Sequence, residues 1–364
     1  MKKIGIIVEY NPLHNGHVYH FNKIKQQANA DLVIAVCSST FTMRGDLSMF
    51  DKFTKAKQAL KLGVDLVIEL PAICTIQNAD IFAYNAVKTL NNAKVDEIWI
   101  GSELNDNSIY EKYYEIEKTA SFNAKIKDNL KQGLSYKTSY NEALKLHNLP
   151  SLNPNDTLGL CYYKAIKKLN SNIVLKTIKR VGDAEDSSTN ITNMPSASYI
   201  RANFNQSFVP NYVYNDYQTY HFDINMLYPY FNYELRLSKN TFFFDEEGIK
   251  SYLMKFVNEP NYNEFINNAH NKRYSKSRIK RFFFYTLFQI TKDDINNSNY
   301  NFLRVLGFNE VGKKYLNFLK KEITIYTNIK EGLNPILDIE LKITKFIDYV
   351  FKTSLMSSEQ NPFK

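Results

Sequence analysis

The feature that most constrains this chain is the run of seventeen residues from Gly5 to Phe21, GIIVEYNPLHNGHVYHF. Apolar residues up to Val8 read as a strand, the run breaks at Asn11-Pro12, and apolar residues then recur at helical spacing at Val18, Phe21 and Ile24. The pattern predicts a buried strand, a loop and a helix. Backbone N–H groups and the positive end of the helix converge at such a junction, which favours binding of a phosphate group.

Three of the six histidines of the chain, His14, His17 and His20, fall within this loop and the predicted helix. Gly16 lets the backbone approach a ligand closely, and His14 and His17 can donate hydrogen bonds to phosphoryl oxygens. A lone histidine in this place more often caps the helix, but three within seven residues after a buried strand favour a phosphate site. We therefore predict that His14 and His17 stabilise negative charge on a transferring phosphate.

The H-x-G-H spacing resembles the signature of the nucleotidyltransferase superfamily, and the string VEYNPLHNGHVYH resembles the N-terminus of the bacterial tRNA(Met) cytidine acetate ligases. The resemblance implies that acetate is activated by ATP as acetyl adenylate. It also implies that the acetyl group passes to N4 of the wobble cytidine of elongator tRNA(Met). The implied ATP-binding residues of this segment are Ile7, Val8, Glu9, Tyr10, Asn11, Pro12, Leu13, His14, Asn15, Gly16, His17, Val18, Tyr19 and His20.

Further apolar runs at residues 31–37, 65–70 and 96–100 predict three more strands, with helix-period segments at 50–62 and 78–92 between them. This alternation predicts an α/β fold with a Rossmann-like parallel sheet and helices on both faces. Ligands of such sheets bind at the carboxyl ends of the strands. Polar residues after the strands, such as Arg44 and the stretch 101–103, are therefore candidates for the site.

The resemblance extends to these loops. Arg44-Gly45-Asp46, followed by Lys52, matches the R-G-D and lysine of the family, and residues 101–103 match its G-S-E, which places Gly101 at ATP. The chain departs from the family at residues 38–40, where Ser-Ser-Thr replaces the common S-G-H or S-G-N.

Three later motifs are also similar to the family. The SLNPND stretch places an ATP contact at Asn155, although Asn155 or Asp156 also suits the N-cap of the helix that follows. A strand predicted over residues 172–178 leads to Arg180 and Val181, which match the arginine-isoleucine pair of the family. SASYIR at 196–201 resembles its S-x-x-x-I-R element, so the implied catalytic residues are His14, His17, Lys52 and Arg201.

From about Val209 the sequence becomes rich in aromatic residues with long helix-compatible segments. We predict a catalytic nucleotidyltransferase-like domain over residues 1–208 and a mainly α-helical domain over 209–364, with a frayed tail after Thr353. Residues 307–314 imitate a Walker A loop, but they lie in a region that we predict to be helical, and Lys314 stands where Ser or Thr must hold Mg²⁺.

The stretch 272–281, KRYSKSRIKR, carries six basic residues and no acidic one. A solvated helix face is one interpretation, and a ridge that binds RNA phosphates is the other. The stretch resembles the K-R-Y-T-x-x-R-x-x-R motif of the family, which implies tRNA binding by Lys272, Arg273, Lys276, Arg278, Lys280 and Arg281.

Composition limits the remaining possibilities. The net charge of +9 suits a polyanionic partner. Cys37, Cys74 and Cys161 are far apart in sequence and form no C-x-x-C pair, so we expect buried free thiols and no structural zinc site. With no apolar run of eighteen residues and no signal-peptide pattern, we expect a cytoplasmic protein without a membrane partner.

Mg²⁺ is expected to accompany ATP, although no carboxylate cluster arranged to hold it is evident. Two other functions fit the residues. One is a nucleotidyltransferase that joins AMP or CMP to a small phosphorylated metabolite, with a C-terminal part that only dimerises. The other is an RNA-binding protein with a degenerate nucleotide site, which the intact His14, Gly16 and His17 disfavour. The oligomeric state stays open.

Overall fold

The protein is described by a computed structural model covering residues 1–182, 194–239, 241–245, 248–296 and 300–360. Its centre is a seven-stranded sheet with the strand order β5-β4-β1-β2-β3-β6-β7. The strands are β1 (Lys3–Val8), β2 (Leu32–Ser38), β3 (Leu66–Leu70), β4 (Glu97–Ser102), β5 (Val174–Lys179), β6 (Leu303–Phe308) and β7 (Ile325–Tyr326). The first five pair in parallel, which confirms the predicted Rossmann-like α/β fold.

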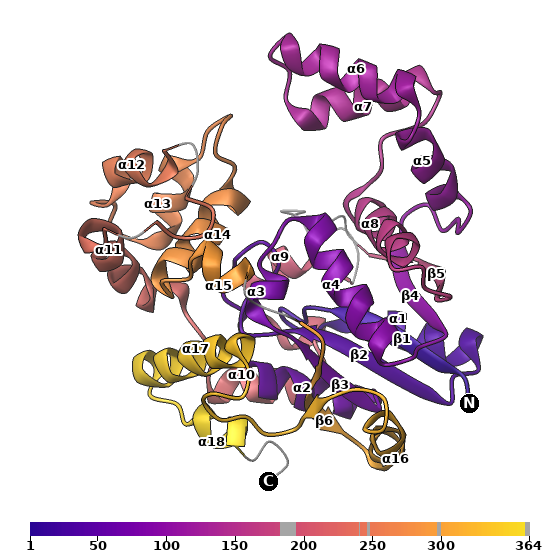
Figure 1. Cartoon of the computed structure of the whole chain (residues 1–364). Coiled ribbons are helices and arrows are strands. Elements are labelled where there is room, and N and C mark those ends of the chain that lie inside the picture. Colours follow the sequence, from indigo (N-terminus) through magenta and orange to yellow (C-terminus); the bar gives the residue numbers. More distant parts are fainter. Residues whose placement is uncertain (183–193, 240, 246–247, 297–299, 361–364) are drawn as a thin grey trace.

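Helices cover both faces of this sheet (Figure 1). The helices up to residue 202 are α1 (Asn15–Ala28), α2 (Lys52–Leu62), α3 (Ala72–Thr75), α4 (Ala79–Asn92), α5 (Ile109–Glu117), α6 (Ala120–Lys131), α7 (Tyr136–Leu146), α8 (Pro154–Lys168) and α9 (Ala197–Ala202). The later helices are α10 (Asn211–Thr219), α11 (Tyr228–Leu237), α12 (Ile249–Leu253), α13 (Tyr262–Ala269), α14 (Lys276–Leu287), α15 (Lys292–Asn296), α16 (Glu310–Leu319), α17 (Pro335–Phe351) and α18 (Leu355–Gln360). Three short 3₁₀ turns lie at Gln206–Phe208, Ile224–Met226 and Met254–Phe256.

Strand β2 shows why the apolar runs are continuous. All seven of its residues are buried. Alternate residues such as Ile34 and Val36 belong to the core that α4, α8 and the C-terminal helices share, while Val33 and Ala35 pack with Phe21 of α1 and other residues on the opposite face. A strand covered on both faces needs apolar residues at every position, so the run carries no alternation.

The described part of the chain after residue 209 is mainly helical, as predicted, but it also adds two strands to the sheet. β6 pairs antiparallel with β3, and β7 extends the same sheet. The Walker-like stretch from Gly307 therefore lies at a strand-to-helix junction, not inside a helix, and Asn309 caps α16 there. A buried apolar run as short as LRVLGF cannot be told from a helix segment by its periodicity. The division between residues 208 and 209 stays a prediction.

The described part of the tail after Thr353, up to Gln360, is ordered, contrary to the prediction of fraying, and residues 361–364 lie outside the described residues. This part forms α18, in which Glu359 is fully buried and accepts a hydrogen bond from Nη2 of Arg304 at 2.9 Å. Among the described residues, no helix is both long and apolar enough to cross a membrane. The three cysteines are free and buried, as predicted.

Candidate nucleotide site

The turn between β1 and α1 is built around its two histidines. His14 is the N-cap of α1 with an extended backbone, and its Nδ1 accepts a hydrogen bond from the backbone N–H of Gly16 at 3.1 Å. The backbone N–H of His14 in turn donates to Nδ1 of His17 at 3.2 Å. The two rings stack with centroids 3.9 Å apart. A Cβ on Gly16 would lie 2.8 Å from Cε1 of His14, so the arrangement needs glycine at this position.

The two reciprocal hydrogen bonds between His14, Gly16 and His17 form a capping box, and they fix the tautomer of both rings. Because each Nδ1 accepts a backbone N–H, the proton of each neutral imidazole must lie on Nε2. Burial, together with the charges of Arg180 and Arg201, lowers the pKa of His14 to about 3. Burial and the neighbouring His14 lower the pKa of His17 well below its usual value. Near pH 7 the pair therefore presents two neutral Nε2–H donors, and within the described part of the chain neither Nε2 has a hydrogen-bond partner.

Not every residue of the segment Ile7–His20 can offer its side chain to a ligand. Tyr10, Asn11, Pro12 and Leu13 are buried, and the Asn11 side-chain oxygen accepts from the backbone N–H of Met49 at 2.9 Å. These residues can contribute only backbone groups. The first turns of α1, from Asn15 to His20, are half-buried.

Two arginines border the histidine loop. Arg201 of α9 donates from Nη1 to the backbone oxygen of Asn11 at 2.8 Å and from Nη2 to Oγ of Ser198 at 3.1 Å. Arg180 follows β5, and its Nη1 lies 3.5 Å from Oε1 of Glu103. Both charges act on His14, so the structure brings Arg180, Arg201 and the histidines together.

The Ser196 of the SASYIR motif is the N-cap of α9, where its Oγ accepts from the backbone N–H of Tyr199 at 3.1 Å. Its side chain is 2% exposed, which is the arrangement of a simple capped helix.

Gly101 and Asn155 come from the neighbouring elements. At Gly101 no atom lies within 4 Å of the position that a Cβ would take, so the strand end faces open space. Asn155 lies in the first turn of α8 and donates from Nδ2 to Oε1 of Glu103 at 2.6 Å. The N-cap of α8 is Asn153, so neither Asn155 nor Asp156 has the predicted cap position. Val181 is 39% exposed directly after Arg180.

Lys52 does not join this site. Its ammonium is buried and lies 2.8 Å from Glu69, 3.2 Å from Glu340 and 2.6 Å from Glu359. Burial alone would lower the pKa of Lys52, but these three carboxylates outweigh that effect and raise it. A buried ammonium with three carboxylate partners cannot hold a departing phosphate, so the expectation of a catalytic Lys52 is wrong.

Lys55, one turn further along α2, contacts the strand ends instead, although the sequence motifs did not predict it. Its buried Nζ donates to the backbone oxygens of Ser38 at 2.8 Å, Ser39 at 2.6 Å and Glu9 at 3.1 Å. The lysine thereby ties the end of β1 to the loop after β2. The signal available in the sequence was a second lysine at i+3 on the face of α2 that carries buried alanines.

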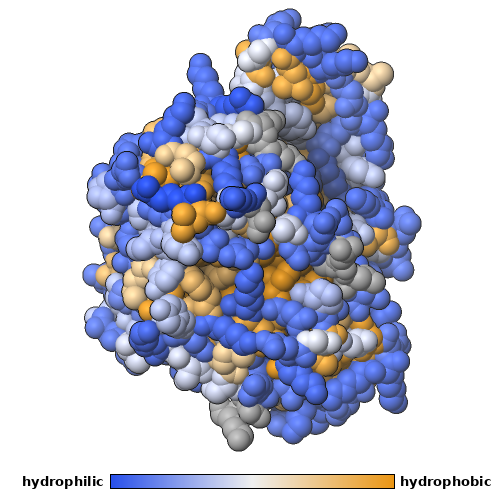
Figure 2. All heavy atoms as spheres, turned by 60° about the vertical axis from the view of Figure 1, so that its left-hand side comes forward, coloured by the Kyte–Doolittle hydropathy of each residue, from blue (hydrophilic) through white to orange (hydrophobic). Residues whose placement is uncertain are grey.

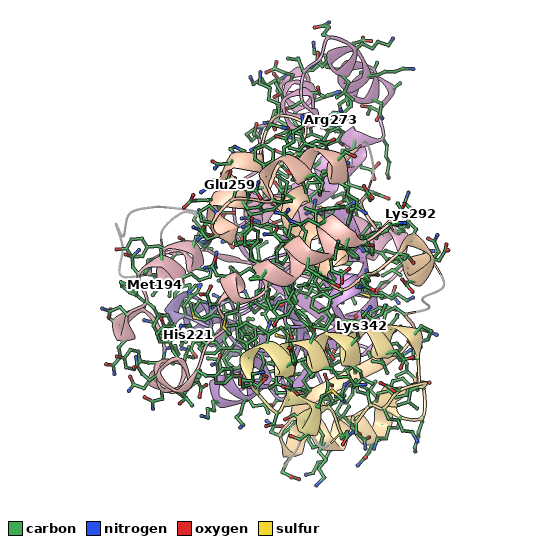
Figure 3. All side chains as sticks on the ribbon, turned by 90° about the vertical axis from the view of Figure 1, so that its left-hand side faces the viewer. Met194, His221, Glu259, Arg273, Lys292 and Lys342 are labelled. Carbon is green, nitrogen blue, oxygen red and sulfur yellow. The ribbon has the colours of Figure 1, made fainter. Side chains whose placement is uncertain are left out.

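The basic stretch 272–281 is only partly helical. α14 begins at Lys276, so Lys272 and Arg273 precede the helix instead of lying on it. The guanidinium carbons of Arg273 and Arg278 both lie 5.4 Å from the ring centre of Tyr274. Figure 3 shows Arg273 towards the top of the helical C-terminal part.

The last two residues of the stretch contact the protein itself. Lys280 pairs with Asp46 at 2.5 Å, and a Cβ on Gly45 would meet the Lys280 backbone at 2.7 Å. Arg281 is packed over the ring of Phe244 at 5.6 Å. The end of the basic stretch at Lys280 therefore packs on the loop that follows β2. Its beginning, with Lys272, Arg273 and Lys276, is exposed.

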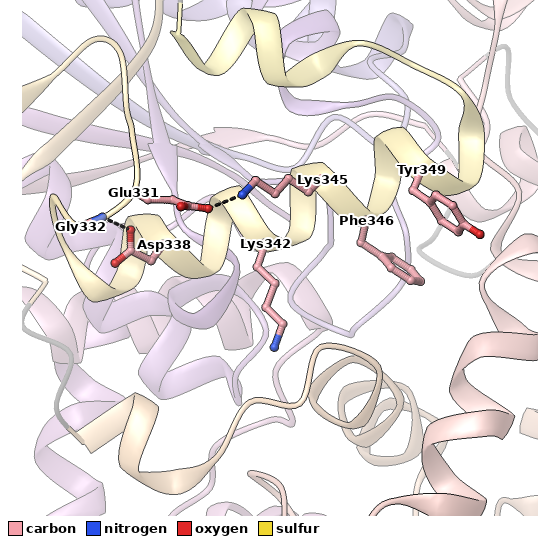
Figure 4. Close-up of a pocket in the computed structure, with 7 residues that line it drawn as sticks. All are labelled: Glu331, Gly332, Asp338, Lys342, Lys345, Phe346 and Tyr349. Carbon is pink, nitrogen blue, oxygen red and sulfur yellow. Dashed lines mark hydrogen bonds and ion pairs between the residues drawn. The ribbon is translucent and has the colours of Figure 1, made fainter.

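A shallow hollow lies elsewhere, along α17 (Figure 4). Its lining includes Lys342, which donates to the backbone oxygen of Phe288 at 2.7 Å, and Lys345, which pairs with Glu331. None of the predicted site residues lines it.

Across the residues that the structure describes, no group of three or more His, Cys, Asp or Glu side chains is arranged to hold a metal ion.

Comparisons of sequence and of structure with known proteins match nearly the full length of this chain to the same family. The HIGH Nucleotidyl Transferase family model matches residues 1–362. The tRNA(Met) cytidine acetate ligases of Staphylococcus aureus strains MRSA252 and JH9 are each 35% identical over 363 residues, covering 94% of both chains. The crystal structure of Thermotoga maritima TmcAL in its apo form I superposes with a TM-score of 0.88 at 27% identity, covering 100% of this chain and 98% of the other. The form bound with alpha-thio ATP gives 0.85 at 26% identity, covering 98% and 96%.

Proposed function

Because the chain belongs to the tRNA(Met) cytidine acetate ligase family, we propose that it uses ATP and acetate to acetylate elongator tRNA(Met). In the first step, an acetate oxygen attacks the α-phosphorus of ATP and pyrophosphate leaves, which gives acetyl adenylate. In the second step, N4 of the wobble cytidine attacks the acetyl carbonyl, AMP leaves and N4 loses a proton. The product is N4-acetylcytidine.

The observation that carries this proposal is the pair of neutral imidazoles at the β1–α1 turn. Their Nε2–H groups are fixed by hydrogen bonds on the other side of each ring, so they need no reorganisation when a phosphate arrives. Donors held in this way stabilise the negative charge that develops on the phosphate oxygens when acetate displaces pyrophosphate at the α-phosphorus. Because the rings are neutral, they donate without adding a proton that acetate would take up.

Arg180 and Arg201 are the cations of the proposed site, and they would hold the departing pyrophosphate. The open space at Gly101 would leave room for the nucleotide, and in this proposal Asn155 of α8 and the exposed Val181 after β5 would contact it. The relative from T. maritima was crystallised with alpha-thio ATP, which supports ATP as the nucleotide.

We propose that Mg²⁺ enters with the triphosphate. Mg²⁺ in nucleotide sites keeps several waters and takes most of its other ligands from the phosphates. That mode fits a chain whose described residues hold no cluster of metal ligands. The ion would neutralise phosphate charge, while the histidines and arginines orient the phosphates.

The basic stretch 272–281 is the proposed tRNA contact next to the site. Its ion pair with Asp46 ties it to the loop after β2, at the carboxyl edge of the sheet. Lys272, Arg273 and Lys276 are exposed for phosphate contacts, while Lys280 and Arg281 position the segment. We further propose that residues 1–208 and 209–364 act as catalytic and tRNA-presenting parts, in the cytoplasm and without a membrane partner.

The test is incubation of the pure protein with labelled acetate, ATP and a tRNA(Met) transcript, followed by nucleoside analysis. We expect the label in N4-acetylcytidine, with release of AMP and pyrophosphate, and no label in a matched transcript with uridine at the wobble position. An adenylylated or cytidylylated small metabolite formed without RNA would instead support a nucleotidyltransferase.

A further inference from the structure

The helical hairpin α6–α7 stands away from the rest of the molecule (Figure 1). It belongs to an insertion between β4 and α8, the two elements that carry Gly101 and Asn155 of the candidate site. Within the hairpin, Phe122 packs edge-on against Tyr140 with ring centres 5.4 Å apart, and both rings join the main hydrophobic core. The hairpin is attached to α5 by a hydrogen bond from the Tyr140 hydroxyl to Oε1 of Glu117 at 2.6 Å.

The surface of this hairpin is basic. Residues 118–148 contain six lysines and only two acidic residues, Asp128 and Glu142. Lys118 pairs with Glu115 and Lys145 pairs with Glu142. Among the described residues, no ion pair neutralises the other four, which are Lys125, Lys127, Lys131 and Lys137.

Exposed apolar and aromatic groups accompany these lysines at the tip. Leu130, Leu134 and Tyr136 are 43%, 39% and 63% exposed. In Figure 2 the hairpin forms the top of the molecule, where a hydrophilic surface surrounds an apolar area. Lysines interleaved with an exposed tyrosine are the mixture that binds a nucleic acid, because lysines contact phosphates and aromatic rings stack on bases.

Hydrogen bonds join α5, which leads into the hairpin, to the two elements β4 and α8 of the candidate nucleotide site. The buried Asp156 of α8 accepts hydrogen bonds from Oγ of Ser102 at the end of β4 and from the hydroxyl of Tyr110 in α5 at 3.0 Å. The 12 residues of α6 make a helix about 18 Å long, so the tip reaches well beyond this junction. In Figure 1 the hairpin projects from the top of the molecule, and Figure 3 shows Arg273 below it on the same upper side.

We propose that the α6–α7 hairpin is an RNA-binding arm that contacts tRNA phosphates away from the reacting cytidine. The inference rests on the proposed function, since tRNA is the polyanion concerned. The arm adds affinity and orients the RNA, and it takes no part in the chemistry. Together with the stretch 272–281, it gives the protein two separate basic contacts for one tRNA.

The test compares two charge-matched triple variants of the full chain. The arm variant reverses three exposed charges of the hairpin and carries Lys127→Glu, Lys131→Glu and Lys137→Glu. The control variant reverses three exposed charges at α16 and carries Lys314→Glu, Lys320→Glu and Lys321→Glu. Figure 1 shows α16 at the opposite end of the molecule. Binding of a tRNA(Met) transcript is measured over a series of salt concentrations. We expect the arm variant to bind at least about tenfold more weakly near 0.1 M salt, with a salt slope reduced by about two.

The control variant should retain binding within about twofold, and ATP binding should be unchanged in both variants. If the glutamates unfold the hairpin, alanines at the same three positions preserve the helices and should still reduce the salt slope. Wild-type binding by the arm variant, or an equal loss in the control, would overturn the proposal.

The same series separates this proposal from the proposed function. A wild-type protein that binds tRNA through the arm but transfers no acetate contradicts the function and leaves the arm standing. A wild-type protein that acetylates tRNA and is insensitive to the arm substitutions contradicts the arm alone.

Discussion

At the scale of single residues, the rings of His14 and His17 cap α1 through one nitrogen and leave the other for the proposed phosphate contact. The sequence left a choice between a helix cap and a phosphate donor, but the two roles would use different atoms of the ring and so do not exclude each other. Each Nδ1 accepts a backbone N–H, while each Nε2 carries the proton that a ligand can use. The cap thus orients the donor.

A pair of substitutions at His14 separates the two tasks. Asparagine is among the best N-cap residues, so His14→Asn should keep the stability of α1 while removing the Nε2–H donor. We expect the acetylation rate to fall by about 100-fold in this variant, with an unchanged midpoint of thermal unfolding. His14→Ala should lose the rate and about 1 kcal/mol of stability as well. A His14→Asn enzyme with the rate of the wild type would show that the ring only caps the helix.

At the scale of elements, α2 is anchored by buried lysines on successive turns. Lys52 neutralises carboxylates from three distant elements, Glu69 of β3, Glu340 of α17 and Glu359 of α18. This cluster fastens the last two helices of the chain to the sheet. A buried ion pair adds little net stability, but removal of one partner leaves uncompensated charges and is costly.

Lys52→Met should therefore destabilise the protein by about 3–5 kcal/mol, measured as a shift of the urea unfolding midpoint. Lys57→Met, an exposed lysine on the same helix, should change stability by less than about 0.5 kcal/mol. Below its unfolding temperature the Lys52→Met enzyme should keep its ATP affinity. A stable Lys52→Met protein that no longer binds ATP would restore Lys52 to the active site.

At the scale of the whole molecule, local patterns were predictable and long-range partners were not. The β1–α1 turn follows from residues within one short stretch, and its strand, loop and helix were found from periodicity and spacing. The partners of Lys52 lie 17, 288 and 307 positions away in the chain, so no local pattern marks its burial. For the same reason, nothing in the sequence around Leu303–Phe308 shows that β6 pairs with β3.

The central claim is that two neutral imidazoles present Nε2–H donors to ATP. The most direct test is a long-range ¹H–¹⁵N spectrum of the protein labelled with ¹⁵N-histidine, recorded between pH 8 and pH 5 and during titration with ATP and Mg²⁺. Since burial lowers the pKa of His14 to about 3 and that of His17 well below its usual value, we predict that both rings stay neutral and protonated on Nε2 over this range. Both Nε2 resonances should shift on saturation with ATP. Protonation on Nδ1, an imidazolium signal at pH 7, or Nε2 resonances that do not respond to saturating ATP would contradict the account.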